Sequence, residues 1–278
     1  MELKNGNGIR WPEGKKIALM VTFDFDEQWL RFSREGRRPL GFADRSRGEY
    51  GVVEGLARCL RVMEKHGLKS TFFIPGTVAE KYPELVQKID KMGHEIGYHG
   101  WEHEDRLDMT MEEEEQNMEK AEAVFQKLIG KKPTGARGCW NVTHEFTPQL
   151  LRTRGYSYSS IMKNCDYAWI YPGEEEAPLV ELSVDHSCDD VTFFYFTFNT
   201  PEHRSNYPIG YVFDYWKDIF DELASEEDKI MVLKLHPQLI GRASRSVLLD
   251  RFLTYAEEHD AWIAPCCQVA DYVKQFGK

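Results

Sequence analysis

Short apolar runs alternate with amphipathic helical segments along most of the chain, and this alternation constrains the fold more than any other feature. The runs of strand type include KIALMVTF, STFFIP, HEIGYH and KIMVLKLHP, and the segments between them carry apolar residues at helical spacing, as in residues 52–66. Strands that alternate with helices form a mostly parallel sheet, and about seven or eight such units are typical of a barrel. The chain shows no linker, low-complexity segment or internal repeat, so we expect one domain, residues 1–278.

Residues with defined capping roles mark the ends of two of these helices. Thr110 and Glu113 have the spacing of a capping box, and Gly130 follows the helix that they begin. Pro83 and Gly93 bracket the segment YPELVQKIDKMG in a similar way, because proline suits the first helical turn and glycine the position after the last. We therefore expect helices at 110–130 and 82–93.

The composition excludes several classes of function. The 278 residues carry a formal net charge of −11, so nucleic acid and anionic membrane surfaces would both repel the protein. No segment approaches the ~20 apolar residues of a membrane span, and we find no secretory signal. The six cysteines lack CxxC spacing. We expect a cytoplasmic protein with reduced thiols, in which Cys139 and Cys188 are packing residues.

Two aspartates end the first strand in the segment VTFDFDEQW. Residues two apart in a strand point the same way, so Asp24 and Asp26 share a face while Phe23 and Phe25 point to the other. In a barrel, this position lies at the mouth, where such folds keep their chemistry. Two close carboxylates repel unless a cation or a shared proton relieves them. The alternative is an exposed strand end with carboxylates that cap a helix.

The segment HGWEH places His99 and His103 four residues apart. The two side chains would meet on one face if the backbone turned helical after the strand, which suits two nitrogen ligands of one metal ion. With Asp26 they form a set of two histidines and one carboxylate that leaves room for water. Iron oxygenases use the same residue types, but there one histidine and the carboxylate are almost adjacent. The order found here favours a hydrolytic site, and ordinary surface or core histidines are the alternative.

Further polar residues follow later strands. His236 ends the strand in MVLKLHPQLIGR, and a lone histidine there can also be purely structural. Arg137 and Trp140 in GARGCWN, with Asp189 and Asp190 in VDHSCDD, are candidates for the same rim. An arginine beside Asp24 would keep that carboxylate ionised and oriented.

The segments TFDFD, HGWEH, RGCW and LKLHP resemble, in order and approximate spacing, the polysaccharide deacetylase family (NodB-like, carbohydrate esterase family 4). The likeness covers residues 15–275. TFFIPG, GHEIGYHGWEHE, VDHSCDD and HPQLIGR look like the branch that holds peptidoglycan-deacetylase-like proteins, cyclic imidases and allantoinases. The resemblance implies a distorted, incomplete (β/α) barrel of about seven strands, and hydrolysis of carbon–nitrogen bonds other than peptide bonds.

The resemblance also implies roles for individual residues. The metal ligands would be Asp26, His99 and His103, with zinc as the expected ion. Asp24 would be the general base and His236 the general acid, with Arg137 in support of Asp24. Substrate-binding roles fall to Trp140 and Asp190. Because Phe25 separates aspartates that are adjacent in most of the family, which of the two is base and which is ligand stays open.

An arginine-rich insertion follows Asp26 directly. The segment EQWLRFSREGRRPLGFADRSRGEY holds six arginines, all within residues 31–47. At a barrel mouth, guanidinium groups would suit a carboxylate on a small substrate, whereas a solvated loop or a subunit contact is the alternative. With the missing export signal, a narrowed mouth predicts that a small cyclic imide or ureide enters more readily than a long glycan.

These observations predict a metal-dependent hydrolase that removes N-acetyl groups or opens small cyclic amides. Asp24 would accept a proton from the attacking water, and His236 would protonate the departing nitrogen. A catalytically silent carbohydrate-binding or assembly protein is the alternative from another class. The expected partners are a small-molecule or soluble carbohydrate substrate and further copies of the chain, a tetramer by resemblance, with no nucleic acid and no membrane.

Overall fold

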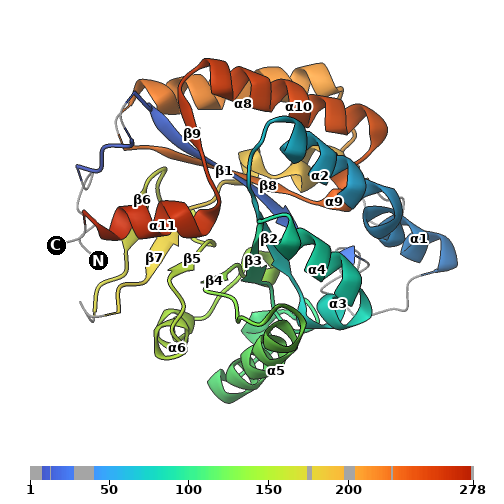
Figure 1. The fold of residues 1–278 in the computed structure, drawn as a ribbon, viewed down its shortest axis with the longest axis vertical. Coiled ribbons are helices and arrows are strands. Elements are labelled where there is room, and N and C mark those ends of the chain that lie inside the picture. The colour runs from blue at the N-terminus through green and yellow to red at the C-terminus, as the bar shows by residue number, and fades with distance from the viewer. Residues whose placement is uncertain are drawn as a thin grey trace.

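The sheet at the centre of the fold is almost entirely parallel and curls toward a barrel (Figure 1). The computed structural model describes residues 8–12, 14–27, 41–173, 177–196, 204–226 and 228–276. Within them the strand order is β6-β7-β5-β4-β3-β2-β1-β8, with β9 also paired to β1. The strands are β1 (Ile17–Asp24), β2 (Thr71–Ile74), β3 (Glu95–Tyr98), β4 (Gly135–Ala136), β5 (Tyr158–Ser159), β6 (Ala168–Ile170), β7 (Val180–Leu182), β8 (Ile230–Leu235) and β9 (Ala261–Ile263).

The barrel is distorted and nearly closed, as predicted. Only β6 runs antiparallel to its neighbour β7. Isolated bridges join Tyr167 to Lys229 and Asp189 to Lys234, and they bring the β6–β7 end of the sheet to β8. The described chain has nine strands, and several of them are short: β4 and β5 have two residues each, and β6, β7 and β9 have three.

Strand β1 lies between β2 and β8 and also pairs with β9, and all eight of its residues are buried. Its odd-numbered residues from Ile17 to Phe23 pack with the surrounding helices, whereas Ala18 and Met20 pack in a second core inside the sheet. Since side chains alternate along a strand, Asp24 continues the inward series of Ala18 and Met20. The sequence therefore directs this carboxylate into the barrel.

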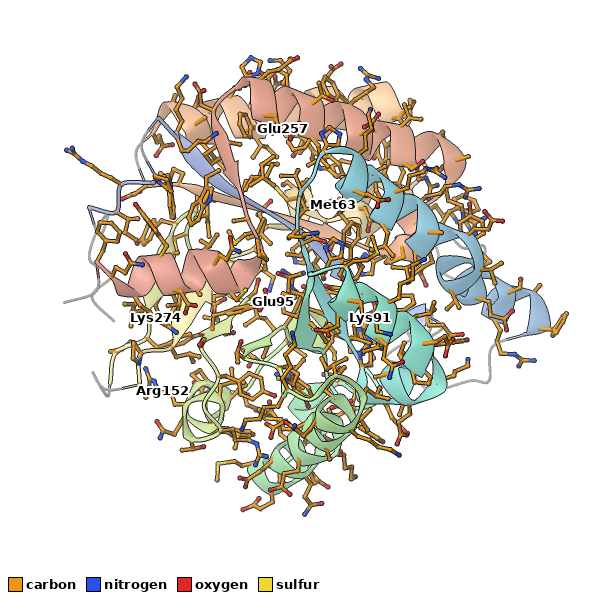
Figure 2. All side chains as sticks on the ribbon, in the orientation of Figure 1. Met63, Lys91, Glu95, Arg152, Glu257 and Lys274 are labelled. Carbon is orange, nitrogen blue, oxygen red and sulfur yellow. The ribbon has the colours of Figure 1, made fainter. Side chains whose placement is uncertain are left out.

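Helices surround the sheet, and their side chains fill the space against it (Figure 2). Met63 of α2 is fully buried there. In Figure 1, α8 and α10 lie side by side over β1, β8 and β9. The helices are α1 (Phe42–Tyr50), α2 (Leu56–Lys65), α3 (Gly76–Lys81), α4 (Pro83–Lys91), α5 (Met111–Ile129), α6 (Thr147–Thr153), α7 (Asp190–Phe194), α8 (Ile209–Ser225), α9 (Pro237–Ile240), α10 (Ala243–Glu258) and α11 (Cys266–Lys274).

The predicted helix ends at α5 and α4 are confirmed. Thr110 and Glu113 form a reciprocal capping box, and Gly130 adopts the left-handed conformation after α5. Pro83 occupies the first turn of α4. No helix of the described part of the chain combines the length and apolar character needed to cross a membrane.

The helix predicted at 52–66 instead begins at Phe42, because α1 continues through a π-helical turn, η2 (Gly51–Gly55), into α2. Two glycines of the π-helical turn pack closely against α9. A Cβ at Gly55 would lie 2.0 Å from the Pro237 carbonyl oxygen, and one at Gly51 would lie 3.1 Å from the Gln238 side chain. Glycine at these two positions lets α9, which follows His236, approach the backbone of the long helix.

Candidate active site

Asp24 is fully buried at the end of β1 and is held by Arg137, which follows β4. Arg137 Nη1 donates to Asp24 Oδ1 at 2.8 Å and to Thr22 Oγ1 at 2.6 Å, and its Nη2 donates to Ser160 Oγ at 2.9 Å. Burial raises the pKa of Asp24, but the charges of Arg137, His99 and Lys234 outweigh it, so the pKa falls below its usual range. The predicted contact between arginine and aspartate is therefore present, and the carboxylate stays ionised.

Asp26 lies among three imidazoles. Its Oδ1 is 3.2 Å from His99 Nε2, and its Oδ2 is 3.7 Å from His103 Nε2 and 3.4 Å from His236 Nε2. Burial raises the pKa of Asp26, but the imidazoles of His103 and His99 lower it further than burial raises it. The structure thus brings both predicted carboxylates to the predicted histidine pair, and His99 Nε2 is also 3.7 Å from Asp24 Oδ2.

His99 is oriented by a main-chain contact. Its Nδ1 lies 3.0 Å from the Arg137 carbonyl oxygen, so Nδ1 carries the proton and donates it there. When the ring is neutral, its lone pair is therefore on Nε2, which faces Asp26. Metal-binding histidines in proteins are commonly fixed by such a hydrogen bond to a carbonyl oxygen.

His103 reaches the site across a bend rather than along a helical turn, which corrects the conformation expected for HGWEH. Residues 101–103 form the bend, Gly100 has a φ of 77°, and His103 itself has a φ of 53°. The Glu104 carboxylate holds the bend by accepting from the main-chain N–H groups of Trp101 and Glu102. A non-glycine residue in the left-handed region costs free energy, and such strain concentrates at functional sites.

Trp140 packs beside His103 at the edge of the site. The two ring centroids are 5.0 Å apart, and Trp140 Nε1 donates to the His103 carbonyl oxygen at 2.9 Å. Both Trp140 and Asn141 have positive φ angles, of 54° and 58°. The indole is half-buried, so part of it faces solvent, and its predicted role in substrate binding stays a prediction.

Asp190 contacts His236, and its predicted role in substrate binding stays a prediction. It is fully buried, and its carboxylate accepts from His236 Nδ1 at 2.7 Å and from the main-chain N–H groups of His236 and Ile240. Burial disfavours the charged imidazole of His236, but Asp190 outweighs this and raises the pKa of His236 to about 9. Asp190 therefore orients His236 and keeps it protonated at neutral pH.

Lys234 is a site residue to which the sequence analysis assigned no role. It is 7% exposed, and its Nζ lies 3.1 Å from Asp189 Oδ2 and 3.7 Å from Asp24 Oδ2, while donating to Asn141 Oδ1 at 2.9 Å. It faces inward because it pairs with Thr22 across β1 and β8. The signal for it is in the sequence, as a single lysine inside the buried run IMVLKL.

The buried polar atoms of the site match a divalent cation. Asp24 Oδ2 and both carboxylate oxygens of Asp26 are buried without a hydrogen-bond partner among the described residues. Buried carboxylate oxygens are rarely left without a hydrogen bond, so these oxygens could accept a further partner such as a metal ion. Asp26, His99 and His103 could hold such an ion with one carboxylate oxygen and two imidazole nitrogens.

Two groups among the described residues bring three metal-ligating atoms within 4.8 Å of one another: His99, His103 and Cys139, and also Asp189, Asp190 and His236. Burial raises the pKa of the Cys139 thiol, which stays protonated and donates to the His99 carbonyl oxygen. The acids of the second group already pair with Lys234 and His236. Both groups are therefore weaker candidates than the set around Asp26.

The fold is thus a distorted barrel, and its cluster of carboxylates and imidazoles lies at the ends of the strands. Residues 44–158 match the family model for polysaccharide deacetylase. A peptidoglycan deacetylase of Helicobacter pylori is 28% identical over 276 residues, which cover 89% of this chain and 92% of the relative. A peptidoglycan deacetylase-like protein of Gibberella zeae is 25% identical, over 89% and 83% of the two chains.

Solved structures show the same relationship. The crystal structure of a Mycobacterium smegmatis protein assigned to the polysaccharide deacetylases superposes with a TM-score of 0.89 at 27% identity, covering 99% of this chain and 96% of that one. The allantoinase PuuE shares the fold, with a TM-score of 0.81 at 23% identity over 94% and 91% of the chains. The family model, the curated relatives and the solved structures thus support the predicted resemblance to the polysaccharide deacetylases, and they support a hydrolase that acts on carbon–nitrogen bonds other than peptide bonds.

Proposed function

We propose that the protein is a metal-dependent amide hydrolase that removes acetyl groups from N-acetylated amino sugars. The observation that carries this proposal is the Asp26 carboxylate, which is buried without a hydrogen-bond partner in the described chain while three imidazole Nε2 atoms face it. The choice of an N-acetyl sugar is supported by the peptidoglycan deacetylases that the chain resembles over most of its length.

We assign the metal to Asp26, His99 and His103, and zinc is the ion that this set of one oxygen and two nitrogen ligands suits. When bound, such an ion lowers the pKa of a water molecule toward ~7 and polarises a carbonyl group. Asp24 is assigned as the general base. Its Oδ1 is occupied by Arg137, whereas its Oδ2 has no hydrogen-bond partner in the described chain and is free to accept a proton from the attacking water.

His236, whose Nε2 lies 3.4 Å from Asp26 Oδ2, is assigned as the general acid. Its Nδ1 donates to Asp190, and its Nε2 points toward Asp26. A protonated Nε2 can donate to the nitrogen that leaves as the amide bond breaks, which makes the amine a better leaving group. An ionised Asp24 and a protonated His236 form the base and acid pair that such a hydrolysis needs.

The retained Asp24 and His236 argue against the alternative of a silent binding protein. A protein that only bound carbohydrate would gain nothing from two buried groups whose pKa values are shifted in opposite directions. These shifts require burial and specific charged partners, and both are present at this site.

A panel of substrates tests the proposed function. Purified protein supplied with zinc is expected to release acetate from N-acetylglucosamine oligomers or peptidoglycan fragments, with one amine formed for each acetate. The panel also contains a small cyclic imide and a ureide, because the sequence predicts that these enter readily and the same residues could open their rings. Hydrolysis of the rings without any acetate release would overturn the choice of substrate, and no hydrolysis at all would overturn the proposal.

Asp190→Asn is expected to move the alkaline limb of the pH–rate profile to lower pH. The asparagine can still accept the hydrogen bond from His236 Nδ1, but it removes the charge that raises the pKa of His236. The protonated imidazole is then lost at lower pH, so turnover falls earlier as the pH rises. An alkaline limb at the wild-type position would contradict the role assigned to the pair, whereas a merely structural role predicts loss of turnover at every pH.

A further inference from the structure

A second polar hollow, of about 430 Å³, lies beyond the end of β8, where α1, α9 and α10 meet. Its walls include the side chains of Arg47, Asn206, Gln238, Arg242 and Arg245. It shares no lining residue with the cluster around Asp26. Gln238 nevertheless follows His236 by two positions, so the hollow adjoins the strand end that carries the assigned acid.

Three guanidinium groups face this hollow with neutral partners. Arg47 donates to the Phe196 carbonyl oxygen, and Arg245 donates to the Leu239 carbonyl oxygen at 3.3 Å and to Asn206 Oδ1 at 3.2 Å. Arg242 lies over the Tyr50 ring, with its Cζ 3.4 Å from the centroid.

No carboxylate of the described chain is within ion-pair distance of these three arginines, although the protein as a whole carries a net charge of −11. Asp190 acts on Arg245 electrostatically, but its oxygens already accept hydrogen bonds from His236 and Ile240. Burial lowers the pKa of both Arg242 and Arg245, and the neighbouring guanidinium of Arg47 lowers both further. Like charges held together in this way are stabilised by an anion between them.

The Gln238 carboxamide is an independent sign of a ligand. The residue is 3% exposed, and neither its Oε1 nor its Nε2 has a hydrogen-bond partner among the described residues. Gly51 leaves room for this side chain, since a Cβ there would lie 3.1 Å from Gln238 Oε1. A buried amide without a partner costs free energy, and an oxygen atom of a ligand could accept the hydrogen bond from Nε2.

We propose that this hollow is a binding site for a small oxyanion, a ligand that carries a carboxylate or phosphate group held by Arg47, Arg242, Arg245 and Gln238. Arginine presents paired N–H donors whose geometry matches carboxylate and phosphate oxygens. Arg47 belongs to the arginine-rich insertion, for which contact with a carboxylate is one of two interpretations of the sequence. In the structure it lines the same hollow as Arg242 and Arg245. The site goes beyond the proposed hydrolysis, because binding of an anion here requires neither the metal nor turnover.

Isothermal titration with inorganic phosphate and with succinate tests the site directly. We expect saturable binding of at least one of them to the wild-type protein, and a rise in melting temperature of about 3 °C at roughly ten times the Kd. Arg245→Gln is expected to weaken binding by about tenfold or more, since it removes a charge-assisted hydrogen bond. Arg245→Lys keeps the charge without the paired donors. Its affinity for the anion is expected to lie between those of the wild type and of Arg245→Gln.

Two control variants distinguish anion binding in this hollow from anion binding at the protein surface or at the metal. Arg61→Gln removes an exposed arginine of α2 and is expected to bind the anion as the wild type does. His99→Ala removes a proposed metal ligand and is expected to retain anion binding, so an anion held by the metal would be recognised by its loss in this variant. Failure of the proposed hydrolysis would leave the anion titration unaffected.

Measurements of KM and Kd distinguish an oxyanion that is part of the substrate from one that is a free ligand. If the oxyanion is part of the substrate, Arg245→Gln raises KM for acidic substrates and leaves KM for neutral ones unchanged. If it is a free ligand, added phosphate or succinate binds with the same Kd in the presence of a neutral substrate. Both results support the site. Absence of phosphate and succinate binding to the wild type, or equal binding by a folded Arg245→Gln variant, would overturn it.

Discussion

Asp24→Asn is expected to reduce turnover by ~10²-fold or more while the protein keeps its metal. Asparagine has nearly the same shape and can still accept from Arg137 Nη1, but its amide cannot take a proton from water. Loss of a general base typically costs 10²–10⁴-fold in rate. The measurement is kcat on an N-acetyl substrate together with metal content by atomic absorption.

The Asp24→Asn variant leaves Arg137 and Lys234 buried without one of their carboxylate partners, so its folding must be checked by thermal unfolding. Glu27→Gln is a matched control, because Glu27 is also a buried acid near the end of β1 but pairs with Lys81 on α3 instead of the histidines. We expect this control to keep its activity.

The roles of the two aspartates can be separated by the same measurements on Asp26→Asn. This variant is expected to lose metal and activity together, whereas Asp24→Asn loses activity alone. The reverse pattern would show that Asp24 is the ligand and Asp26 the base. The sequence left this choice open, and the geometry supports Asp26 as ligand because its carboxylate, unlike that of Asp24, makes no hydrogen bond to an arginine.

Much of the site could be predicted because parallel strands place their carboxyl ends at one edge of the sheet. Asp24, His99, Arg137 and His236 each follow or end a different strand, and the structure brings all four together. Strand ends can be located from apolar runs and from the glycine or proline that follows them. Proximity of the four side chains then follows from the fold class alone.

The remaining features depend on packing that sequence spacing does not encode. Asp190 lies against His236 because α7, which it begins, packs against α9 and accepts hydrogen bonds from the main-chain N–H groups of His236 and Ile240 through this carboxylate. His103 reaches Asp26 through a bend that is held by Glu104, which no helical or strand periodicity would indicate. The role of Lys234 could not be predicted, because the partners of one charged residue in a buried strand depend on which residues lie across the sheet from it.

The arginine-rich insertion illustrates the same limit. Residues 28–40 lie outside the described part of the chain, so the predicted role of the arginines there is not addressed. Residues 42–50 form α1, where Arg47 joins a cluster whose other members, Arg242 and Arg245, lie almost two hundred positions later. A composition bias in one segment could point to an anion, but only the fold shows which arginines act together.

His99→Ala is expected to remove most of the bound metal from a protein that otherwise carries about one divalent ion per chain. His99 Nε2 is 3.2 Å from Asp26 Oδ1, and its ring is fixed by the hydrogen bond from Nδ1 to the Arg137 carbonyl oxygen. Loss of a group that merely orients a ligand lowers metal affinity ~10–100-fold, so loss of the ligand itself should cost at least ~100-fold. Titration with zinc against a chromophoric chelator measures this change.

His94→Ala is the matched control for this prediction, because His94 lies at the opposite end of β3 from His99. It is also buried, but its Nδ1 accepts from the Ser70 N–H and its ring packs edge-on against Phe72. Its removal leaves a cavity and lowers stability, yet the metal affinity should stay at the wild-type value, since no group near Asp26 changes. Full zinc occupancy in a folded His99→Ala variant, or equal loss of zinc in both variants, would contradict the ligand set, because only the His99 end of the strand faces the carboxylates.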